Sequence, residues 1–376
     1  MYKKIEIGNL VTLRQGFAIN KKTNHHMSEE PTQLHLLRIG DMKDGKFSIF
    51  VKDTIPEKFI AKEDDIIYTR TGQVGLVFRK QHGVVHNNCF TVTSNDLNIL
   101  QQEFLFYALQ EKSFYEEAIS RATGAAQPDL PHGAFNSIQI FLPPIESQKK
   151  ISNILNTYDN LIENNQKQIK LLEEAAQRLY KEWFVDLRFP GHENTKIIDG
   201  IPEGWSKGSL SNIALFKRGK TITKAQVEKG DIPVVAGGLK PAYYHNKANT
   251  VAPVITVSGS GANAGYTKLY NIDVFASDCS FADSKTTPNL FFVYCFLKNN
   301  KEMVNSLQKG AAQPHVYAKD INSINLLVPN TKLINKFCKL VAPYFEKIKI
   351  LENQNKLTSQ ARDRLLPKLV NGELEV

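Results

Sequence analysis

Three short stretches contain side chains that could do chemistry, but none of them completes a catalytic site. Residues 259–264 (GSGANA) fit the dinucleotide-binding pattern G-x-G-x-x-G/A, yet the residues that follow read as a strand where that pattern requires a helix. Asp129 and Glu146 could form a nuclease carboxylate pair, but Lys149 completes Glu-x-x-Lys where such sites want Glu-x-Lys. Leu142 precedes two prolines where an adenine methyltransferase would need Asp or Asn. We therefore expect no catalytic residues and no AdoMet site in this chain.

The His and Cys residues do not form a metal-ligand pattern. His25 and His26 are adjacent, so they cannot share a helix face, and no Cys or acidic partner recurs at ligand spacing. Because the cysteines form no CxxC pair, we expect neither zinc nor a disulfide but buried thiols in a reducing compartment: Cys89, Cys279, Cys295 and Cys338. No apolar run approaches the ~20 residues that span a bilayer, so we expect a cytoplasmic protein without a membrane partner.

The chain of 376 residues contains the pentapeptide GAAQP twice, at 124–128 and at 310–314. The same offset of 186 residues relates Phe106 to Phe292, Asn136-Ser137-Ile138 to Asn322-Ser323-Ile324, Pro143 to Pro329, Tyr158 to Tyr344, and Arg178 to Arg364. These identities indicate a tandem duplication. Gln127 and Gln313 could contact a ligand or cap a backbone group. We favour the structural role, because a residue common to both copies cannot explain a difference in what they bind.

Each copy begins with a globular module and continues into a long helix. Residues 1–142 and 205–328 alternate short β-like runs with turns and one helix-like segment, which predicts two mixed α/β (α+β) modules. A linker at 187–204 contains Pro190-Gly191 and Pro202-Glu203-Gly204. The aligned stretches 63–78 and 252–267 are each a strand that breaks into a polar glycine loop. Their loop side chains differ, as expected for two modules of one fold that recognise different things.

The segments 143–186 and 329–376 carry apolar residues at alternating spacings of four and three, which is the pattern of a coiled-coil seam. The first seam is Ile151, Leu155, Tyr158, Ile162, Asn165, Ile169, Leu172, Ala176, Leu179 and Trp183. The second seam is Phe337, Val341, Tyr344, Ile348, Leu351, Asn355, Thr358, Leu365 and Leu369, with Arg362 breaking the apolar pattern. Each seam contains one Asn that would fix the register. Pro343 should kink or restart the second helix, and Pro367 with Gly372 should end it.

Two matching apolar stripes predict an antiparallel intramolecular helix pair, because a single amphipathic helix of this length would expose its stripe to water. The alternative is that the two helices stay separate and that each packs on its own module.

These features together resemble the specificity subunits of type I restriction-modification systems. The motifs that carry the resemblance are the two GAAQP modules, LPPIESQKKISNIL (142–155), LVPNTKLINKFCKL (327–340), LLEEAAQRLYKEWFVDL (171–187), IPEGW (201–205) and LLPKLVNGEL (365–374). The resemblance covers nearly the whole chain, although the first module begins without an IPEGW-like lead-in. It implies two target recognition domains that each read half of a split double-stranded DNA target, and spacer helices where methylation subunits dock.

The resemblance also implies a chain without catalysis of its own, which directs adenine methylation and cleavage by partner subunits. AdoMet, Mg²⁺ and ATP are then expected on the partners, with two methylation subunits for each chain and possibly restriction subunits. The charge agrees with a polyanionic partner, because residues 191–376 hold 24 basic and 15 acidic side chains while residues 1–190 hold 23 of each.

The polar loops supply residues that could read DNA, since Arg and Lys bind guanine, Asn and Gln bind adenine, and Ser or Thr binds either. In the first module the candidate base readers are Arg70, Thr71, Gln73, His86, Asn87 and Asn88, with Arg14, Lys21 and Lys22 on phosphates. In the second module the candidate readers are Ser258, Ser260, Asn263, Ser277 and Asp278, with Lys217, Arg218, Lys220 and Lys224 on phosphates.

Two other classes of function remain open at this point. The chain could be a stand-alone DNA-acting enzyme with an unrecognised site, which incubation of pure protein with DNA and Mg²⁺ or AdoMet would reveal. It could instead be a protein-binding scaffold whose helices dimerise, and a steep salt dependence of DNA binding would count against that reading.

The helix length yields a first testable prediction. A continuous helix over 146–183 has 38 residues and would reach roughly 57 Å at ~1.5 Å per residue. Inserting one heptad near Gln166 adds ~10 Å and keeps the seam in phase. We expect the non-specific gap in the DNA target to grow by about one to three base pairs, at ~3.4 Å each, with both half-sites unchanged. Mapping of methylated sites measures this, and an unchanged gap at full activity would show that the helices do not set the distance.

Overall fold

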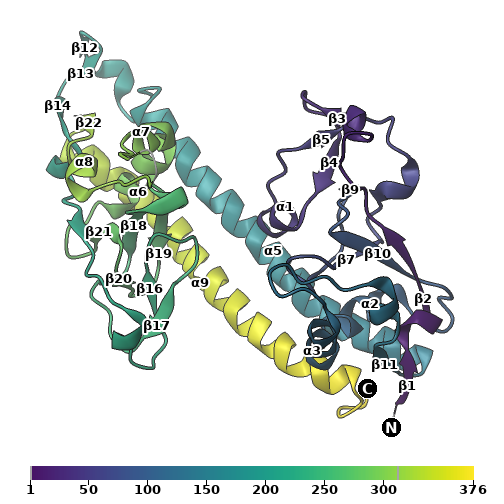
Figure 1. The fold of residues 1–376 in the computed structure, drawn as a ribbon. Coiled ribbons are helices and arrows are strands. Elements are labelled where there is room, and N and C mark those ends of the chain that lie inside the picture. Colours follow the sequence, from purple (N-terminus) through teal and green to yellow (C-terminus); the bar gives the residue numbers. More distant parts are fainter. Residues whose placement is uncertain (1, 311–312) are drawn as a thin grey trace. The chain divides into compact units, whose positions relative to one another are not determined.

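A computed structural model of the chain describes residues 2–310 and 313–376, so Ala311 and Ala312 of the second pentapeptide lie outside the described residues. Two helices of 40 residues each, α5 (Ile145–Phe184) and α9 (Thr331–Val370), dominate the chain (Figure 1). The chain divides into two compact units. Unit 1 contains the first module, the part of α5 up to Glu163 and the part of α9 from Asn355 onward. Unit 2 contains residues 164–354.

The first module is built on three antiparallel or mixed sheets. A two-stranded sheet pairs β1 (Lys3–Glu6) with β11 (Gln139–Leu142). A four-stranded antiparallel sheet has the order β2 (Val11–Gln15), β10 (Cys89–Ser94), β7 (Ile66–Thr69) and β8 (Val77–Phe78). A five-stranded sheet has the order β3 (Met27–Ser28), β5 (Phe50–Val51), β4 (Leu34–Leu37), β9 (Gly83–Val85) and β6 (Ile60–Ala61). Its helices are α1 (Ile39–Asp44), α2 (Gln102–Ala108), α3 (Lys112–Arg121) and α4 (His132–Asn136).

The second module repeats this plan with fewer strands in the last sheet. Strand β14 (Ser206–Ser209) pairs with β22 (Asn325–Val328). The four-stranded sheet has the order β15 (Lys217–Arg218), β21 (Cys279–Asp283), β18 (Val254–Ser258) and β19 (Thr267–Tyr270). The third sheet has three strands, β17 (Tyr243–His245), β16 (Ile232–Val235) and β20 (Phe275–Ala276). Its helices are α6 (Leu290–Asn299), α7 (Lys301–Ser306) and α8 (Ala318–Asn322).

The duplication is visible in strand register as well as in element order. Cys89 lies opposite Thr69 in the first four-stranded sheet, and Cys279 lies opposite Ser258 in the second. In both modules the third sheet contains one parallel pair, β4 with β9 and β16 with β20. All four cysteines are buried free thiols, and burial raises the pKa of Cys89 to about 12. The mixed α/β prediction is confirmed, and the copies differ mainly in the size of the third sheet.

Three sequence expectations need correction. Helix α9 runs unbroken through Pro343, which is exposed while Val341 and Phe345 beside it are buried, so packing holds the helix across the missing hydrogen bond. The single helix-like segment of the first module is two helices, α2 and α3. The linker 187–204 contains a short hairpin of β12 (Ile197–Ile198) and β13 (Ile201–Pro202).

The seam residues hold the two helices together inside each unit. In unit 1, Ile151 and Leu155 of α5 and Leu366 and Leu369 of α9 share a buried cluster with the core of the first module. The N-terminal part of α5 thus meets the C-terminal part of α9, which makes the pair antiparallel. Every predicted seam position is buried or half-buried.

In unit 2, aromatic residues of α5 pack on Phe337 of α9, with ring centroids 6.0 Å from Tyr180 and 6.0 Å from Trp183. These residues also contact the core of the second module through Phe292. In both units the helices therefore pack on each other and on a module. The expected helix pair is confirmed, and the alternative of two separate helices is wrong, although both helices also pack on the modules.

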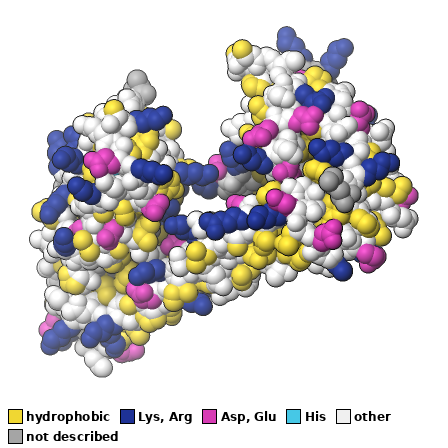
Figure 2. Space-filling view, turned by 90° about the horizontal axis from the view of Figure 1, so that it is seen from below, with side chains coloured by type: hydrophobic (Ala, Val, Ile, Leu, Met, Phe, Trp, Pro, Cys, Tyr) yellow, Lys and Arg dark blue, Asp and Glu magenta, His cyan; other side chains and the backbone are white. Residues whose placement is uncertain are grey.

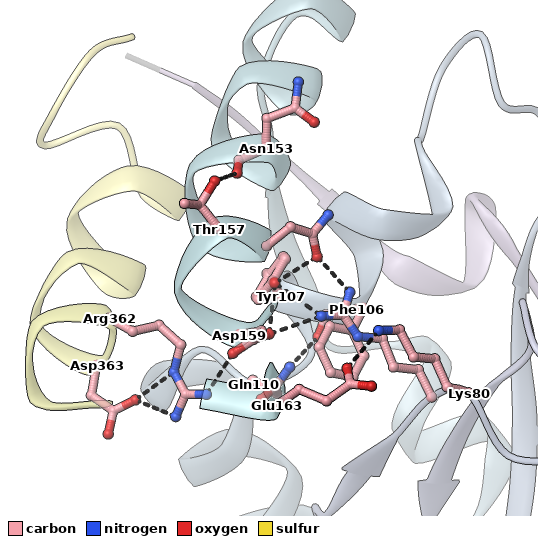
Figure 3. A network of polar contacts seen from close by, with 12 residues as sticks. Lys80, Phe106, Tyr107, Gln110, Asn153, Thr157, Asp159, Glu163, Arg362 and Asp363 are labelled. Atoms are coloured by element: carbon pink, nitrogen blue, oxygen red, sulfur yellow. Dashed lines mark hydrogen bonds and ion pairs between the residues drawn. The ribbon is translucent and has the colours of Figure 1, made fainter. Parts of the chain in front are cut away.

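Arg362, which interrupts the second seam, belongs to a network of charged and polar side chains (Figure 3). The Asp159 carboxylate of α5 accepts hydrogen bonds from Arg362 Nη1 at 2.6 Å and from Arg79 Nη2 at 2.8 Å. Tyr107 Oη donates to the same carboxylate at 2.7 Å, and burial raises the pKa of Tyr107, which keeps it a donor. Asn156 Oδ1 accepts from both Arg79 and Tyr107 at 2.8 Å. The network joins α9, α5 and the first module.

The second copy has an apolar layer at the same place. The offset of 186 residues relates Asp159 to Phe345 and Arg362 to Ala176, and these two residues are 2% and 0% exposed. At this place the helix pair of unit 1 therefore adds an ion network to its hydrophobic packing, whereas the equivalent place in unit 2 is apolar.

The network predicts a sizeable loss of stability when Asp159 is changed. Asp159→Asn removes the carboxylate that binds the partly buried Arg79 and leaves Arg362 with only the exposed Asp363, so we expect the free energy of unfolding of unit 1 to fall by about 2–3 kcal/mol. Urea unfolding measures the loss, and hydrogen exchange of α2 and α5 amides locates it. Glu116→Gln is the matched control, because it removes only the solvent-exposed pair with Lys112 and should cost less than about 0.5 kcal/mol. Equal effects of the two changes would contradict the assignment.

Candidate functional site

Four segments meet at one end of each four-stranded sheet. In the first module, the Arg70 amide donates to the Asn88 carbonyl at 2.8 Å, the Asn87 amide to the Phe17 carbonyl at 2.9 Å, and the Gly72 amide to the Pro128 carbonyl at 2.8 Å. These bonds bring together the segments 16–17, 70–73, 86–88 and 128–130. We call this place the junction of the first module.

The junction of the second module is built in the same way from the segments 219–220, 259–263, 276–278 and 314–316. The Gly259 amide donates to the Asp278 carbonyl at 3.1 Å, the Lys220 amide to the Ala276 carbonyl at 2.9 Å, and the Gly261 amide to the Pro314 carbonyl at 3.0 Å. Most of the predicted base readers therefore come together in each module, although they are far apart in the chain.

Glycine makes this close meeting possible. A Cβ at Gly16 would lie 2.2 Å from the His86 carbonyl oxygen, and a Cβ at Gly219 would lie 2.2 Å from that of Ser277. The strand leading to each glycine can therefore approach the neighbouring segment only without a side chain at that position.

The repeated pentapeptide closes the junction. Gly124 and Gly310 have φ values of +93° and +98°, in the region that favours glycine. Across the loop, Thr123 and Asp129 exchange two backbone hydrogen bonds at 2.8 Å, and Lys309 and His315 do the same at 2.9 and 2.8 Å. The residues at the two ends of the pentapeptide loop therefore pair in the same way in both copies. The side chains of Gln127 and Gln313 are exposed on it.

In the first junction, Arg70 is held by neighbours rather than free. Its guanidinium donates to both carboxylate oxygens of Asp129, at 3.1 and 2.6 Å, and to Gln15 Oε1 at 3.0 Å. Thr71 Oγ1 donates to the same carboxylate. The hydrogen bonds from Arg70 and Thr71 lower the pKa of Asp129. Arg70 and Thr71 therefore form a clamp with Asp129 at the centre of the junction.

The other predicted readers of the first module surround this clamp. His86 Nδ1 accepts the Asn88 amide at 3.3 Å, and burial lowers the pKa of His86, so the neutral ring carries its proton on Nε2 and can donate outward. The side chains of Asn87 and Asn88 are half-buried and make no hydrogen bond with another described residue. Gln73 is exposed, and its Oε1 accepts from Lys43 Nζ at 3.0 Å.

In the second junction, two of the predicted readers are buried. Ser258 and Ser277 are 3% and 5% exposed, and both bond inside the module, Ser258 Oγ to the Gly237 carbonyl at 3.0 Å and Ser277 Oγ to the Ile222 amide at 3.4 Å. Because they sit under the loop, they cannot reach a base edge as placed. Ser260 Oγ donates to Asp278 Oδ2, and both lie at the half-buried rim with Asn263.

The basic residues predicted for phosphate contact fall into two groups. Arg14 is bound to Asp65 Oδ2 at 2.8 Å and to Thr91 Oγ1 at 3.3 Å, so its guanidinium already has an anionic partner. The other predicted cations are exposed: Lys21, Lys22, Lys217, Arg218, Lys220 and Lys224. Figure 2 shows one face of the molecule, where Lys and Arg side chains occur over both modules with acidic and hydrophobic side chains among them.

Sequence reasoning missed three residues of the junctions. Gln15 bonds both Arg70 and the Asn87 carbonyl, the latter at 2.6 Å. Asp129 and His315 occupy equivalent positions directly after the two pentapeptides, and each bridges its junction through the backbone. The sequence contained a signal for Asp129 and His315, because the first residue after the repeated GAAQP differs between the copies.

The described residues show no cluster of three or more His, Cys, Asp or Glu side chains that could hold a metal ion. Within the same residues, no helix has the length and hydropathy needed to cross a membrane. Residues 261–263 form a 3-10 turn, and strand β19 follows at Thr267, so the helix that a dinucleotide-binding loop needs is replaced by a strand. This agrees with the sequence expectation for 259–264.

Comparison with known proteins identifies a family for both modules. The family model described as type I restriction modification DNA specificity domain matches residues 1–174 and 202–358. The specificity subunit of the type I restriction enzyme MjaIX from Methanocaldococcus jannaschii is 28% identical over 342 residues, which cover 83% of this chain and 78% of that protein. The specificity subunit of the HindI enzyme from Haemophilus influenzae is 23% identical over 433 residues, which cover 90% of this chain and 94% of that protein.

A solved structure has the same fold. The crystal structure of a type I restriction-modification S subunit from M. genitalium aligns over 98% of this chain and 96% of its own, with a TM-score of 0.62 and 21% identity. The predicted architecture of two tandem α/β modules joined by long helices is thereby confirmed.

The clamp in the first junction predicts a pH-dependent contribution to stability. Asp129→Asn removes the anion that holds Arg70, and because both side chains are partly exposed we expect a loss of about 1 kcal/mol at pH 7. The folded pKa of Asp129 is lowered, so its contribution is present above the unfolded value of ~3.9 and is lost as the pH falls through the folded pKa. Urea unfolding of both proteins at neutral and acidic pH measures the difference. Asp53→Asn, at an exposed position of the same module, should show no such change, and a pH-independent loss at Asp129 would contradict the clamp.

Proposed function

Because this chain belongs to the family of type I restriction-modification specificity subunits, non-catalytic subunits whose role is DNA recognition, we propose that its two modules read the two halves of one bipartite DNA target. Each junction would face the major groove of one half-site, with its side chains on base edges and the exposed lysines on phosphates.

One observation carries this proposal. The two junctions have the same backbone hydrogen bonds but different side chains at equivalent places: Arg70 against Gly259, Asn88 against Asp278, and Asp129 against His315. A surface with one scaffold and two sets of donors and acceptors is suited to reading two different short sequences.

We further propose that methylation subunits dock on α5 and α9 and that AdoMet, Mg²⁺ and ATP bind to partner subunits. Apolar side chains on these helices remain exposed, among them Leu171 at 63%, Ile350 at 58% and Leu357 at 57%. In unit 2, a hollow of about 420 Å³ is lined by Leu171, Ala175, Leu179 and Tyr344 with charged residues at its edge. Exposed apolar patches rimmed by charge are typical of protein interfaces. Two methylation subunits are expected, since a duplicated chain presents two similar faces.

The direct test compares the purified chain with its complex. The chain alone should neither cut nor methylate DNA, and tight sequence-specific binding with AdoMet-dependent adenine methylation should appear when methylation subunits are added. Turnover by the highly purified single chain would refute the proposal. A binding strength that hardly changes with salt would favour a protein-binding scaffold instead.

Module exchange tests whether the two halves are read independently. Replacing residues 205–328 with the equivalent module of another specificity subunit should change one half-site and leave the other intact. Methylation-sensitive sequencing of cells carrying the chimera with the methylation subunits identifies both halves. A chimera that altered both halves would show that the modules are not independent readers, whereas loss of all methylation together with loss of the folded core would call for an exchange at other boundaries.

A further inference from the structure

The second junction contains a cavity of about 210 Å³. Its lining includes Arg218 of β15, Gly259 and Asp278 of the junction loops, and His315 and Tyr317 after the pentapeptide. The cavity lies where four segments meet, and backbone hydrogen bonds hold these segments together.

The same place in the first junction is filled by a side chain. By the shared backbone bonds, Arg70 is equivalent to Gly259, and its neighbours Gln15 and Asp129 are equivalent to Arg218 and His315. The guanidinium of Arg70 lies between Gln15 and Asp129, within 2.6–3.1 Å of their oxygens. In the second junction, glycine supplies no such side chain, and the space that Arg70 takes in the first copy is open to a ligand.

The open cavity presents both a donor and an acceptor. Arg218 is exposed and forms no ion pair with another described residue, so its guanidinium is free to donate. Asp278 likewise has no cationic partner among the described residues, and Ser260 Oγ donates to its Oδ2. That bond orients the carboxylate and leaves Oδ1 available as an acceptor.

We propose that Arg218 and Asp278 together read one G·C base pair in the half-site of the second module. This inference rests on the proposed function and specifies it. In the major groove, guanine offers the O6 and N7 acceptors that a guanidinium binds in a bidentate way, and the paired cytosine offers the N4 amino group that a carboxylate accepts. The two side chains therefore match the two sides of one pair.

Charge and size argue against other occupants of the cavity. The Asp278 carboxylate repels a phosphate oxygen, so Arg218 does not act here as a simple phosphate contact. An A·T pair offers the adenine N6 donor where guanine has the O6 acceptor, and the thymine O4 acceptor where cytosine has the N4 donor, so it satisfies the pair of side chains less completely. In the first module, Arg70 blocks the equivalent space, so the two modules read by different means.

The test uses the full chain assembled with its methylation subunits. The target is first defined by selection from randomised duplex DNA, and binding is then measured on a panel in which each base pair is changed in turn. Asp278→Ala and Arg218→Ala should each reduce the preference for G·C at one position of one half-site by about 10- to 100-fold, with the other half-site unchanged. Asp278→Asn keeps the size and an acceptor for Ser260 but replaces one acceptor with a donor. It should shift the preference at that position away from G·C.

Lys224→Ala is the matched control in the same module, because Lys224 is exposed and lies outside the cavity. It should weaken binding to all sequences alike. The slope of the logarithm of the binding constant against the logarithm of the salt concentration should fall by the amount expected for about one phosphate contact. Thermal unfolding of each variant checks that the module remains folded.

Three results would overturn the inference. Arg218→Ala could behave like the Lys224 control, which would make it a phosphate contact. The half-site could require A·T at the affected position, or it could contain no position that responds to either residue. Absence of specific binding by the unaltered complex would instead contradict the proposed function itself.

Discussion

Main-chain hydrogen bonds hold the four segments of each junction together, and the placement of the junction side chains depends on them. The bond from residue 70 to the carbonyl of Asn88 is 2.8 Å long, and the equivalent bond from Gly259 to Asp278 is 3.1 Å long. Because amides and carbonyls are the same in every residue, the scaffold persists whatever side chains it carries. Residue type is restricted at the close approach of Gly16 and Gly219 and at the positive φ of Gly124 and Gly310. The fold therefore separates what must stay constant from what can vary.

The helix pair has the same seam repeat in both units but differs in one layer, which is charged in unit 1 and apolar in unit 2. Unit 1 uses the ion network of Asp159 and Arg362, while unit 2 uses Phe345 and Ala176 at the equivalent positions. A partly buried Arg362 placed opposite an apolar surface would lose Asp159 and keep only its pair with the exposed Asp363, which is unfavourable. The two halves of each helix are therefore not interchangeable, although their seams follow the same repeat. The charged layer thus helps to select the correct pairing.

The two junctions show how one backbone scaffold can carry two different sets of side chains. A single replacement of arginine by glycine, at residues 70 and 259, changes a filled centre into a cavity. The residue after each pentapeptide changes with it, since Asp129 binds the arginine and His315 lines the cavity. These paired differences are expected of side chains that pack against each other, because a charge left without its partner is costly.

The sequence alone determined the duplication, the α/β class of both modules and the two long helices, because repeats and apolar periodicity are local properties of the chain. It also located the loops of the junctions, since glycine and polar residues mark turns that follow strands. Tertiary structure decided which loop side chains are exposed and unpaired, and can therefore contact a ligand. Ser258 and Ser277 have the right chemistry but are buried, Arg14 and Arg70 are held by Asp65 and Asp129, and Pro343 is carried through a helix by its packed neighbours. Burial and pairing depend on residues far away in the chain, so no local pattern could have revealed them.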